Sequence, residues 1–215
     1  MLSLPVPGFA RKLYEKRLEK DVIKGFLPEH IMVVTEDVEI ENHVEKFREL
    51  ITWCFKLGIK EITLCIHVSG KRNYKEFPDR ILGEVRRLNG GNLNINLITP
   101  DEFIENGDGD YHLNLIVGYG GRVEITDAIK KMAELVERGE IRPEEICEED
   151  VEKYLKIKNS PDLIIKAGED IPDFLIWQSI YSELYFLDIG WSDMRYIDFL
   201  RCLRGYQKRE RRFGR

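Results

Sequence analysis

Short apolar runs alternate with charged segments of helical pattern along most of this chain of 215 residues. Six runs have the length and the β-branched content of buried strands: Ile31–Val34, Glu61–Val68, Asn94–Thr99, Leu113–Val117, Leu163–Lys166 and Leu184–Leu187. Helical spacing of apolar residues predicts helices near Ala10–Lys24, Val44–Leu57, Phe77–Leu88, Glu124–Arg138, Pro143–Leu155, Phe174–Glu183 and Asp193–Arg212. The alternation predicts an α/β fold with about six parallel strands joined by crossover helices.

We expect one domain over residues 1–215, with an N-terminal helical segment at 1–27 and a C-terminal helix and tail at 193–215. The chain has no internal repeat and no low-complexity linker. In parallel sheets, ligands bind at the carboxyl ends of the strands. Candidate binding loops are therefore residues 35–42, 68–73, 118–123 and 167–174.

Composition indicates a globular protein, with 43% hydrophobic residues and a formal net charge of −6. No apolar run has the length of a membrane span. The four cysteines, Cys54, Cys65, Cys147 and Cys202, form no C-x-x-C pair, which predicts buried thiols rather than disulfides or zinc ligands. We expect a cytoplasmic protein without a nucleic-acid partner, and leave peripheral membrane contact open.

The C-terminal tail has a charge opposite to that of the chain. Arg201–Arg215 carries seven Lys or Arg residues and one Glu, a net charge of +6, so the preceding residues sum to −12. One interpretation is a helix whose terminal cations complement its dipole. The other is an anion site, in which the Arg212 guanidinium and the Gly214 N–H bind a phosphate. Helical spacing in the same segment predicts one buried stripe, formed by Tyr196, Phe199, Leu200, Leu203 and Tyr206.

A glycine pair follows the fourth predicted strand. In LNLIVGYGGRVEI, residues 113–125, Gly120 and Gly121 let backbone amides approach a ligand, and Arg122 adds positive charge. Such a turn is common when taken alone. Three other segments accompany this turn: FLIWQSIYSELYFLD at Phe174–Asp188, ITWCFKLGIKEITL at residues 51–64 and RERRFG at residues 209–214. With these four segments, the chain resembles the cis-prenyltransferases, the family of undecaprenyl and dehydrodolichyl diphosphate synthases.

The resemblance implies a six-stranded parallel sheet, a dimer, and Mg²⁺-dependent condensation of isopentenyl diphosphate with an allylic diphosphate. It also implies that Arg212 and Gly214 reach into the partner's active site and contact isopentenyl diphosphate there.

The chain departs from the family pattern at its first strand. Catalytic members have an Asp-Gly-Asn-x-Arg-Trp loop that holds magnesium and the allylic diphosphate, whereas residues 30–42 here read HIMVVTEDVEIEN. Glu36 stands at the aspartate position, Asp37 follows it, and the glycine, asparagine, arginine and tryptophan are missing. Glu36 and Asp37 are therefore weak candidates for metal ligands.

Three further departures concern the substrate sites. Residues 67–73 read HVSGKRN and lack the family's active-site glutamate and tryptophan. His67 is either a functional residue or a hydrogen-bonded histidine of the loop. In DLIIKAGEDIPDF at residues 162–174, Lys166 replaces the first of two phosphate-binding arginines, and a lysine cannot grip a phosphate bidentately. The segment from Phe77 to Tyr111 is too short for the helices that form the prenyl tunnel.

These departures favour a non-catalytic or weakly catalytic subunit of a heteromeric enzyme, similar in pattern to the Nogo-B receptor type. Its catalytic partner would hold Mg²⁺ and make a long-chain polyprenyl diphosphate for a carrier lipid such as dolichol. Arg122 and Lys166, with Gly120 and Gly121, would be residual anion contacts or structural groups. The alternatives are a divergent active homodimer that uses Glu36 or Asp37 for magnesium, and a scaffold protein on the same fold.

Overall fold

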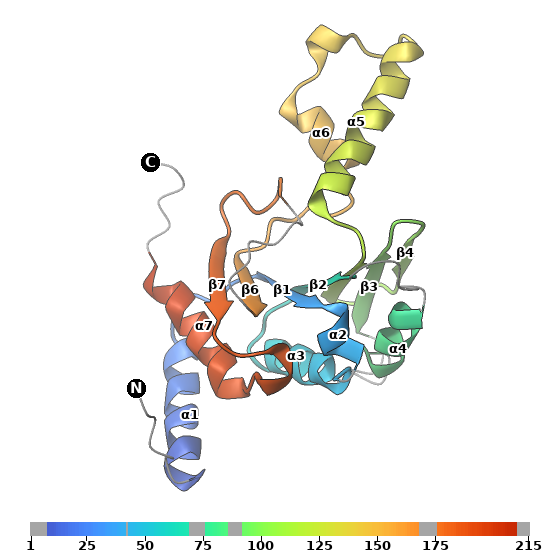
Figure 1. The fold of residues 1–215 in the computed structure, drawn as a ribbon. Coiled ribbons are helices and arrows are strands. Elements are labelled where there is room, and N and C mark those ends of the chain that lie inside the picture. Colours follow the sequence, from blue (N-terminus) through green and yellow to red (C-terminus); the bar gives the residue numbers. More distant parts are fainter. Residues whose placement is uncertain (1–7, 42, 69–75, 86–91, 168–175, 210–215) are drawn as a thin grey trace.

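The computed structural model describes residues 8–41, 43–68, 76–85, 92–167 and 176–209. A seven-stranded sheet with the order β4-β3-β5-β2-β1-β6-β7 runs through the molecule (Figure 1). Its strands are β1 His30–Glu36, β2 Glu61–His67, β3 Leu93–Ile98, β4 Phe103–Asn106, β5 Tyr111–Val117, β6 Leu163–Ala167 and β7 Glu183–Leu187. All pairs are parallel except β3 with β4, so the predicted α/β class and its six parallel strands are confirmed.

The seventh strand, β4, was not predicted. It pairs antiparallel with β3 at the edge of the sheet, and all four of its residues are exposed. A short turn precedes it, in which the Thr99 N–H donates to the Glu102 carbonyl at 2.9 Å and the Glu102 N–H donates to Thr99 Oγ1 at 3.0 Å. Because β4 buries no face, it lacks the apolar pattern by which the other strands were found.

The α-helices are α1 Gly8–Ile23, α2 Asp37–Glu41, α3 Glu45–Lys56, α4 Glu76–Val85, α5 Gly121–Glu137, α6 Glu148–Tyr154 and α7 Tyr196–Lys208. Short 3₁₀ turns lie at Pro143–Glu145 (η2) and Trp191–Asp193 (η3). Two expectations were wrong. The expected loop after β1 forms helix α2, whose acidic first turn suits a helix N-terminus. The expected helix within Phe174–Glu183 is a series of turns over the described residues 176–181.

The main core lies on the face of the sheet that α1, α3, α4 and α7 cover. The predicted apolar stripe of the last helix is buried there within its own chain, since Phe199, Leu200 and Leu203 have no exposed surface. Helix α1 packs beside α7, and Gln207 Nε2 donates to the Val22 carbonyl at 2.8 Å. No helix among the described residues is long and apolar enough to cross a membrane.

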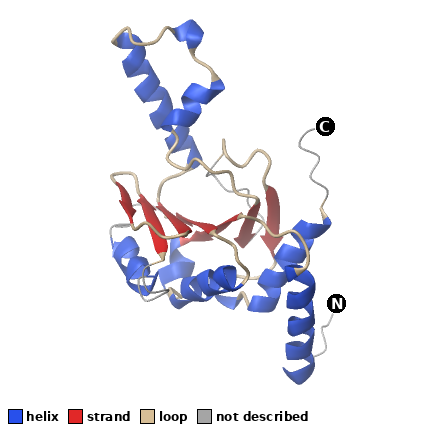
Figure 2. Ribbon diagram, turned by 180° about the vertical axis from the view of Figure 1, so that it is seen from behind, coloured by secondary structure: helices blue, strands red, loops and turns tan. Residues whose placement is uncertain are grey.

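The opposite face of the sheet carries a smaller apolar cluster, which is formed by Met32, Val34, Cys65, Ile98, Ile116, Tyr119, Ile157 and Ile164. Helices α5 and α6 rise from this side and stand away from the sheet (Figures 1 and 2). They form a projecting arm, which we call the α5–α6 arm.

A buried polar ladder fixes the register of the three central strands. His30 Nε2 on β1 lies 2.7 Å from Thr63 Oγ1 on β2, and Asn114 Nδ2 on β5 donates to Thr63 Oγ1 at 3.1 Å and to Glu61 Oε1 at 3.0 Å. Burial lowers the pKa of His30, which favours the neutral imidazole in the ladder. The aligned strands bring their carboxyl ends to one edge of the sheet.

The thiol prediction is confirmed for three cysteines. All four cysteines are free, and Cys54, Cys65 and Cys202 are buried. Burial raises the pKa of Cys202 to about 12. Cys147 is exposed, contrary to expectation, because it precedes α6 on the α5–α6 arm, away from the core.

Candidate functional site

The carboxyl ends of four adjacent strands place several candidate residues on one face of the sheet. Glu36 at the end of β1 pairs in register with His67 at the end of β2, and Lys166 on β6 pairs with Val34. Val34 belongs to the smaller apolar cluster. Because side chains alternate along a strand, Glu36 and Lys166 face the same side as that cluster. These strand ends form the edge at which the sequence predicts a site.

The turn from β5 into α5 has the geometry of an anion site. Gly118 adopts φ +64°, a left-handed conformation that favours glycine, and its N–H donates to the Ile66 carbonyl at 3.0 Å. Gly120 is the N-cap of α5 and no side chain caps it, so first-turn amides remain available to a ligand. A cavity of about 190 Å³ opens between this turn and the end of β2, with His67, Gly118 and Gly120 in its lining.

The predicted cations do not form one phosphate cradle. Arg122 lies exposed in the first turn of α5 beside Gly120 and Gly121. Lys166 lies on β6, three positions from β5 in the sheet order, and is 7% exposed. Its Nζ donates to the Ala167 carbonyl at 3.1 Å. The structure therefore brings Gly120, Gly121 and Arg122 together and places Lys166 at a separate point.

The two candidate metal ligands, Glu36 and Asp37, lie where β1 ends and α2 begins. Asp37 is fully buried, and its Oδ1 accepts from the Val38 N–H at 2.9 Å. Glu36 and Glu39 are both half-buried, and the Glu39 carboxylate accepts from Thr35 Oγ1 at 2.9 Å. No group of three or more metal-ligating side chains occurs among the described residues. Magnesium is usually held by carboxylates together with substrate phosphates. The acidic helix α2 offers no cation to such a phosphate.

Lys156 is a cation near this edge that sequence reasoning missed. Its Nζ lies 3.9 Å from the centroid of the Tyr119 ring and donates to the Thr99 carbonyl at 3.3 Å. Burial lowers the pKa of Lys156 and raises that of Tyr119, whose hydroxyl donates to Asp127 at 3.1 Å. No motif surrounds Lys156, so only the fold reveals this position.

Glu124 and Gln178 attach the base of the α5–α6 arm to the sheet. Glu124 is buried and accepts from the Lys156 N–H at 2.7 Å, the Ile157 N–H at 3.3 Å and Gln178 Nε2 at 3.2 Å. Gln178 Nε2 also donates to the Ile157 carbonyl at 2.9 Å. Gln178 belongs to the WQ-x-x-YSELYF segment, so the described contacts of this part of the motif are structural.

We predict that Glu124→Ala destabilises the protein by about 2–4 kcal/mol, because three buried donors lose their acceptor. Thermal unfolding should shift down by roughly 5–15 °C for a chain of this size. Glu134→Ala, an exposed glutamate on the same helix, is the matched control and should change stability by less than about 0.5 kcal/mol. Equal melting of the Glu124 variant and the parent would contradict this role.

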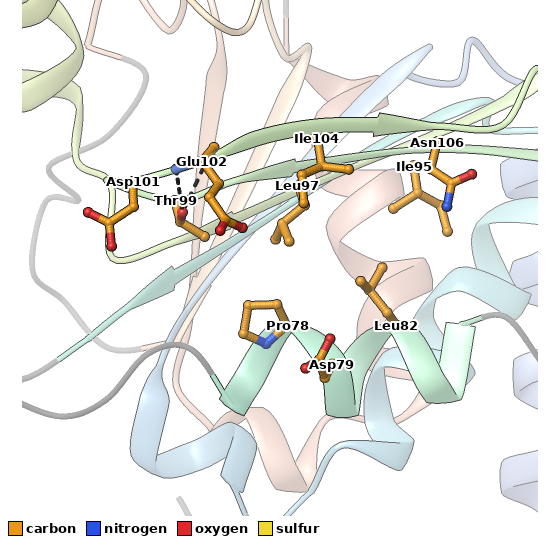
Figure 3. Close-up of a pocket in the computed structure, with 10 residues that line it drawn as sticks. All are labelled: Pro78, Asp79, Leu82, Ile95, Leu97, Thr99, Asp101, Glu102, Ile104 and Asn106. Carbon is orange, nitrogen blue, oxygen red and sulfur yellow. Dashed lines mark hydrogen bonds between the residues drawn. The ribbon is translucent and has the colours of Figure 1, made fainter.

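A second cavity, of about 340 Å³, lies between α4 and the β3–β4 edge (Figure 3). Leu82 extends from α4 toward Ile95 and Leu97 of β3, and Asp79 and Glu102 lie among the polar lining residues. Ligand pockets commonly measure about 300–1,000 Å³, so this space suits a short apolar group rather than a long isoprenoid.

The remaining site predictions lie outside the described residues. These are Arg212 and Gly214 of the tail, and the Lys-Arg-Asn stretch at residues 71–73. They stay predictions.

The fold defines a class: an α/β protein with a mostly parallel sheet, whose strand β5 leads through a glycine turn into helix α5. The chain matches the family described as "Putative undecaprenyl diphosphate synthase" over residues 73–214. It is 38% identical to a tritrans,polycis-undecaprenyl-diphosphate synthase (geranylgeranyl-diphosphate specific) of Methanocaldococcus jannaschii, covering 95% of this chain and 89% of the relative. It is 34% identical to an isoprenyl transferase of Thermus thermophilus, in an alignment that covers 94% of this chain and 95% of the relative.

This chain belongs to the cis-prenyltransferase family. A solved structure of lavandulyl diphosphate synthase from Lavandula x intermedia shares the fold, with a TM-score of 0.72 and 24% identity over 88% of this chain and 99% of the other. The alignment with the M. jannaschii relative spans 248 positions but only 95% of 215 residues, so about forty of its positions have no counterpart here. That the missing positions fall between Phe77 and Tyr111 stays a prediction. The relatives named here are a synthase and a transferase rather than Nogo-B-receptor-type subunits.

Proposed function

We propose that this chain serves polyprenyl diphosphate synthesis as one subunit of a dimeric cis-prenyltransferase. The enzyme would add isopentenyl units from isopentenyl diphosphate to an allylic diphosphate. Membership of the family and the names of the relatives support this reaction. The four free thiols support a reducing compartment, the cytoplasm, as its location.

The proposal that this subunit does not itself catalyse the reaction rests mainly on one observation. Strand β1 runs directly into the acidic helix α2, where Asp37 and Glu39 occupy the first turn and no basic residue occurs. An allylic diphosphate would meet negative charge at this position. We therefore assign the chemical step and Mg²⁺ to the active site of a homologous partner.

In this proposal, the C-terminal tail after α7 contributes substrate-binding groups to the partner's active site. The proposal is that the Arg212 guanidinium and the Gly214 N–H bind isopentenyl diphosphate in the partner's site. A guanidinium forms charge-assisted, bidentate hydrogen bonds with phosphate oxygens, and a glycine amide is sterically open. The preserved RERRFG ending beside an altered β1 loop supports this division of labour.

A second candidate is an active homodimer, and the comparisons favour it over the accessory role. The M. jannaschii relative is named as a synthase and matches nearly the whole chain. In this arrangement each chain would supply its own tail to the other, and Glu36 would be the carboxylate nearest the expected metal position. The comparisons give no support to a dolichol product or to an accessory subunit in particular.

The dimer surface needs a correction. The family resemblance places both Phe174–Asp188 and the last helix at the dimer interface, but the apolar stripe of α7 is buried in its own chain. Within Phe174–Asp188, four exposed apolar residues lie on β7, an edge strand, and in the turns before it. Ile176, Ile180, Tyr181 and Phe186 are 42%, 70%, 63% and 37% exposed, and a cavity of about 540 Å³ adjoins Ile180 and Tyr181. We propose this surface as the interface.

We predict that the chain is a dimer when alone and co-purifies with a catalytic homologue when the two are co-expressed. The double variant Ile180→Ser/Phe186→Ser should weaken both assemblies, because it removes apolar area from the proposed interface. Light scattering and affinity co-purification measure the two states. Leu13→Ser removes an equally exposed aliphatic side chain from α1 and is the control. A parent chain that stays monomeric under both conditions would refute the assembly.

A further inference from the structure

Strand β4 is an open edge of the sheet. It stands at one end of the strand order, and within the described part of the chain it pairs with β3 alone. All four of its residues, Phe103–Asn106, are exposed. Because successive residues of a strand direct their N–H and C=O groups to alternate sides, half of these groups point away from β3. Such a row of backbone groups is a template for pairing with another extended chain.

The two ends of β4 are fixed to neighbouring backbone. At its start, the Thr99 N–H donates to the Glu102 carbonyl at 2.9 Å. At its end, Gly107 adopts φ +102°, and a Cβ at this position would collide with the Leu93 carbonyl oxygen. Glycine alone therefore permits this close approach of the turn to β3. A strand that is already held in place costs less conformational entropy when a partner binds to it.

The cavity of about 340 Å³ opens beside this edge, between α4 and the β3–β4 hairpin (Figure 3). Aliphatic side chains from all three elements line it: Leu82, Ile95, Leu97 and Ile104. Ile104, on β4 itself, is 46% exposed. Asp101 and Glu102 lie at one end of the lining and Asn106 lies at the other (Figure 3). The edge of the sheet is thus combined with a space that admits one short apolar group.

The hairpin that carries β4 is strongly acidic. Residues 101–110 contain no lysine or arginine and five carboxylates, all exposed: Asp101, Glu102, Glu105, Asp108 and Asp110. Asp79 of α4 is a further exposed carboxylate in the lining of the cavity. A second copy of β4 would bring the same carboxylates opposite these ones, and like charges on paired strands repel. A basic chain would instead be attracted to this edge.

We propose that β4 and the cavity beside it bind an extended, basic segment of a partner polypeptide. The segment pairs with β4 as an additional strand, places one aliphatic side chain in the cavity, and sets its lysine or arginine residues against the carboxylates of the hairpin. In strand addition, main-chain hydrogen bonds supply affinity and pockets for alternate side chains supply specificity. Phe103 is 49% exposed and points to the side of the strand opposite to Ile104, where it offers a second apolar contact.

This binding edge lies apart from the surface proposed for the dimer. Strands β4 and β7 are the two opposite edges of the sheet (Figure 1). The exposed apolar residues proposed for the dimer lie on β7 and in the turns before it. A segment added to β4 therefore leaves the dimer surface uncovered, and the two interactions can occur together.

The test measures fluorescence polarisation of a labelled peptide, Lys-Val-Lys-Leu-Lys-Val-Lys with blocked termini, in the presence of the full chain. We expect saturable binding that weakens as salt rises, and no binding when glutamate replaces every lysine of the peptide. Two analogues carry N-methyl groups on alternate residues, along one edge of the peptide or along the other. One should bind like the parent peptide and the other about tenfold or more weakly, because methylated amides cannot donate to β4.

Variants of the chain separate charge from apolar contact. Glu102→Gln/Glu105→Gln should weaken binding by up to about tenfold, since exposed ion pairs are individually weak. Ile104→Ser should weaken it by roughly fivefold, because it removes part of the apolar lining of the cavity. Glu134→Gln/Glu137→Gln removes two exposed carboxylates from the α5–α6 arm and should bind like the parent. All these side chains are exposed, so thermal unfolding should match the parent.

Absence of saturable binding, equal binding of the two methylated peptides, or unchanged binding by Glu102→Gln/Glu105→Gln would overturn the proposal. Displacement of the peptide by farnesyl diphosphate would also overturn it, because the cavity would then hold a prenyl group. Dissociation of the dimer by the peptide would show that a second copy covers this edge, and would overturn it as well. No prenyl transfer enters the assay, and Ile180→Ser/Phe186→Ser should bind the peptide like the parent. The outcome is therefore independent of the proposed function.

Discussion

Replacing Arg212 by alanine should lower kcat/KM for isopentenyl diphosphate by roughly ten- to a hundredfold in the assembled enzyme. A charge-assisted hydrogen bond to a diphosphate contributes about 1.5–3 kcal/mol, and each 1.4 kcal/mol is a factor of ten in rate. If Arg212 were only a cation at a helix end, its loss would cost about 0.3–1 kcal/mol of stability and leave turnover unchanged. Steady-state kinetics of the reconstituted pair, with parent or variant subunit, measure the effect.

The control for this variant follows from the contacts of α7. Arg209 is unsuitable, because its Nη1 donates to Glu183 at 2.7 Å and to the Leu184 carbonyl at 2.9 Å, and so attaches the helix end to β7. Arg204 is exposed on the same helix, and Arg204→Ala should leave kcat/KM unchanged. Deleting Gly214 and Arg215 should act like Arg212→Ala by removing the backbone donor. Equal kcat/KM values for the Arg212 variant and the parent would rule out a contact in the partner's site.

The six parallel strands could be predicted because each is a short apolar run, and β1, β2, β5 and β6 are buried along most of their length. Strand β4 could not, since all its residues are exposed and its pairing depends only on backbone hydrogen bonds with β3. The last helix, α7, shows a different limit of prediction from apolar periodicity. Its apolar stripe predicts burial correctly, but periodicity does not say whether the covering surface comes from the same chain or from a partner.

The candidate site was predictable where a local pattern defines it. Gly118 to Arg122 lie between a strand and a helix, and the structure places this turn beside the end of β2 as expected. Lys156 and Glu124 were missed, because their contacts join residues that are far apart in the sequence, such as Glu124 with Gln178. The helical form of the segment after β1 was not foreseen, because five residues are too few to show helical periodicity.

The purified chain alone should show no measurable incorporation of isopentenyl units, even with Mg²⁺ and an allylic diphosphate. Helix α2 supplies neither an arginine nor a glycine-rich set of amides to that diphosphate, and Lys166 is a single buried point charge on β6. Rebuilding the Asp-Gly-Asn-x-Arg sequence at residues 36–40 should not restore activity. The short segment from Phe77 to Tyr111 would still lack the helices that the family uses for its prenyl tunnel, and Lys166 would still be the only cation offered by residues 162–174.

The central claim is that this chain completes a partner's active site instead of operating its own. The most direct measurement is incorporation of labelled isopentenyl diphosphate into polyprenyl product by three preparations: this chain, a catalytic homologue from the same genome, and the two together. We predict product from the pair at a rate well above that of the homologue alone, and none from this chain. Steady product formation by the pure chain would contradict the claim and establish the active homodimer instead.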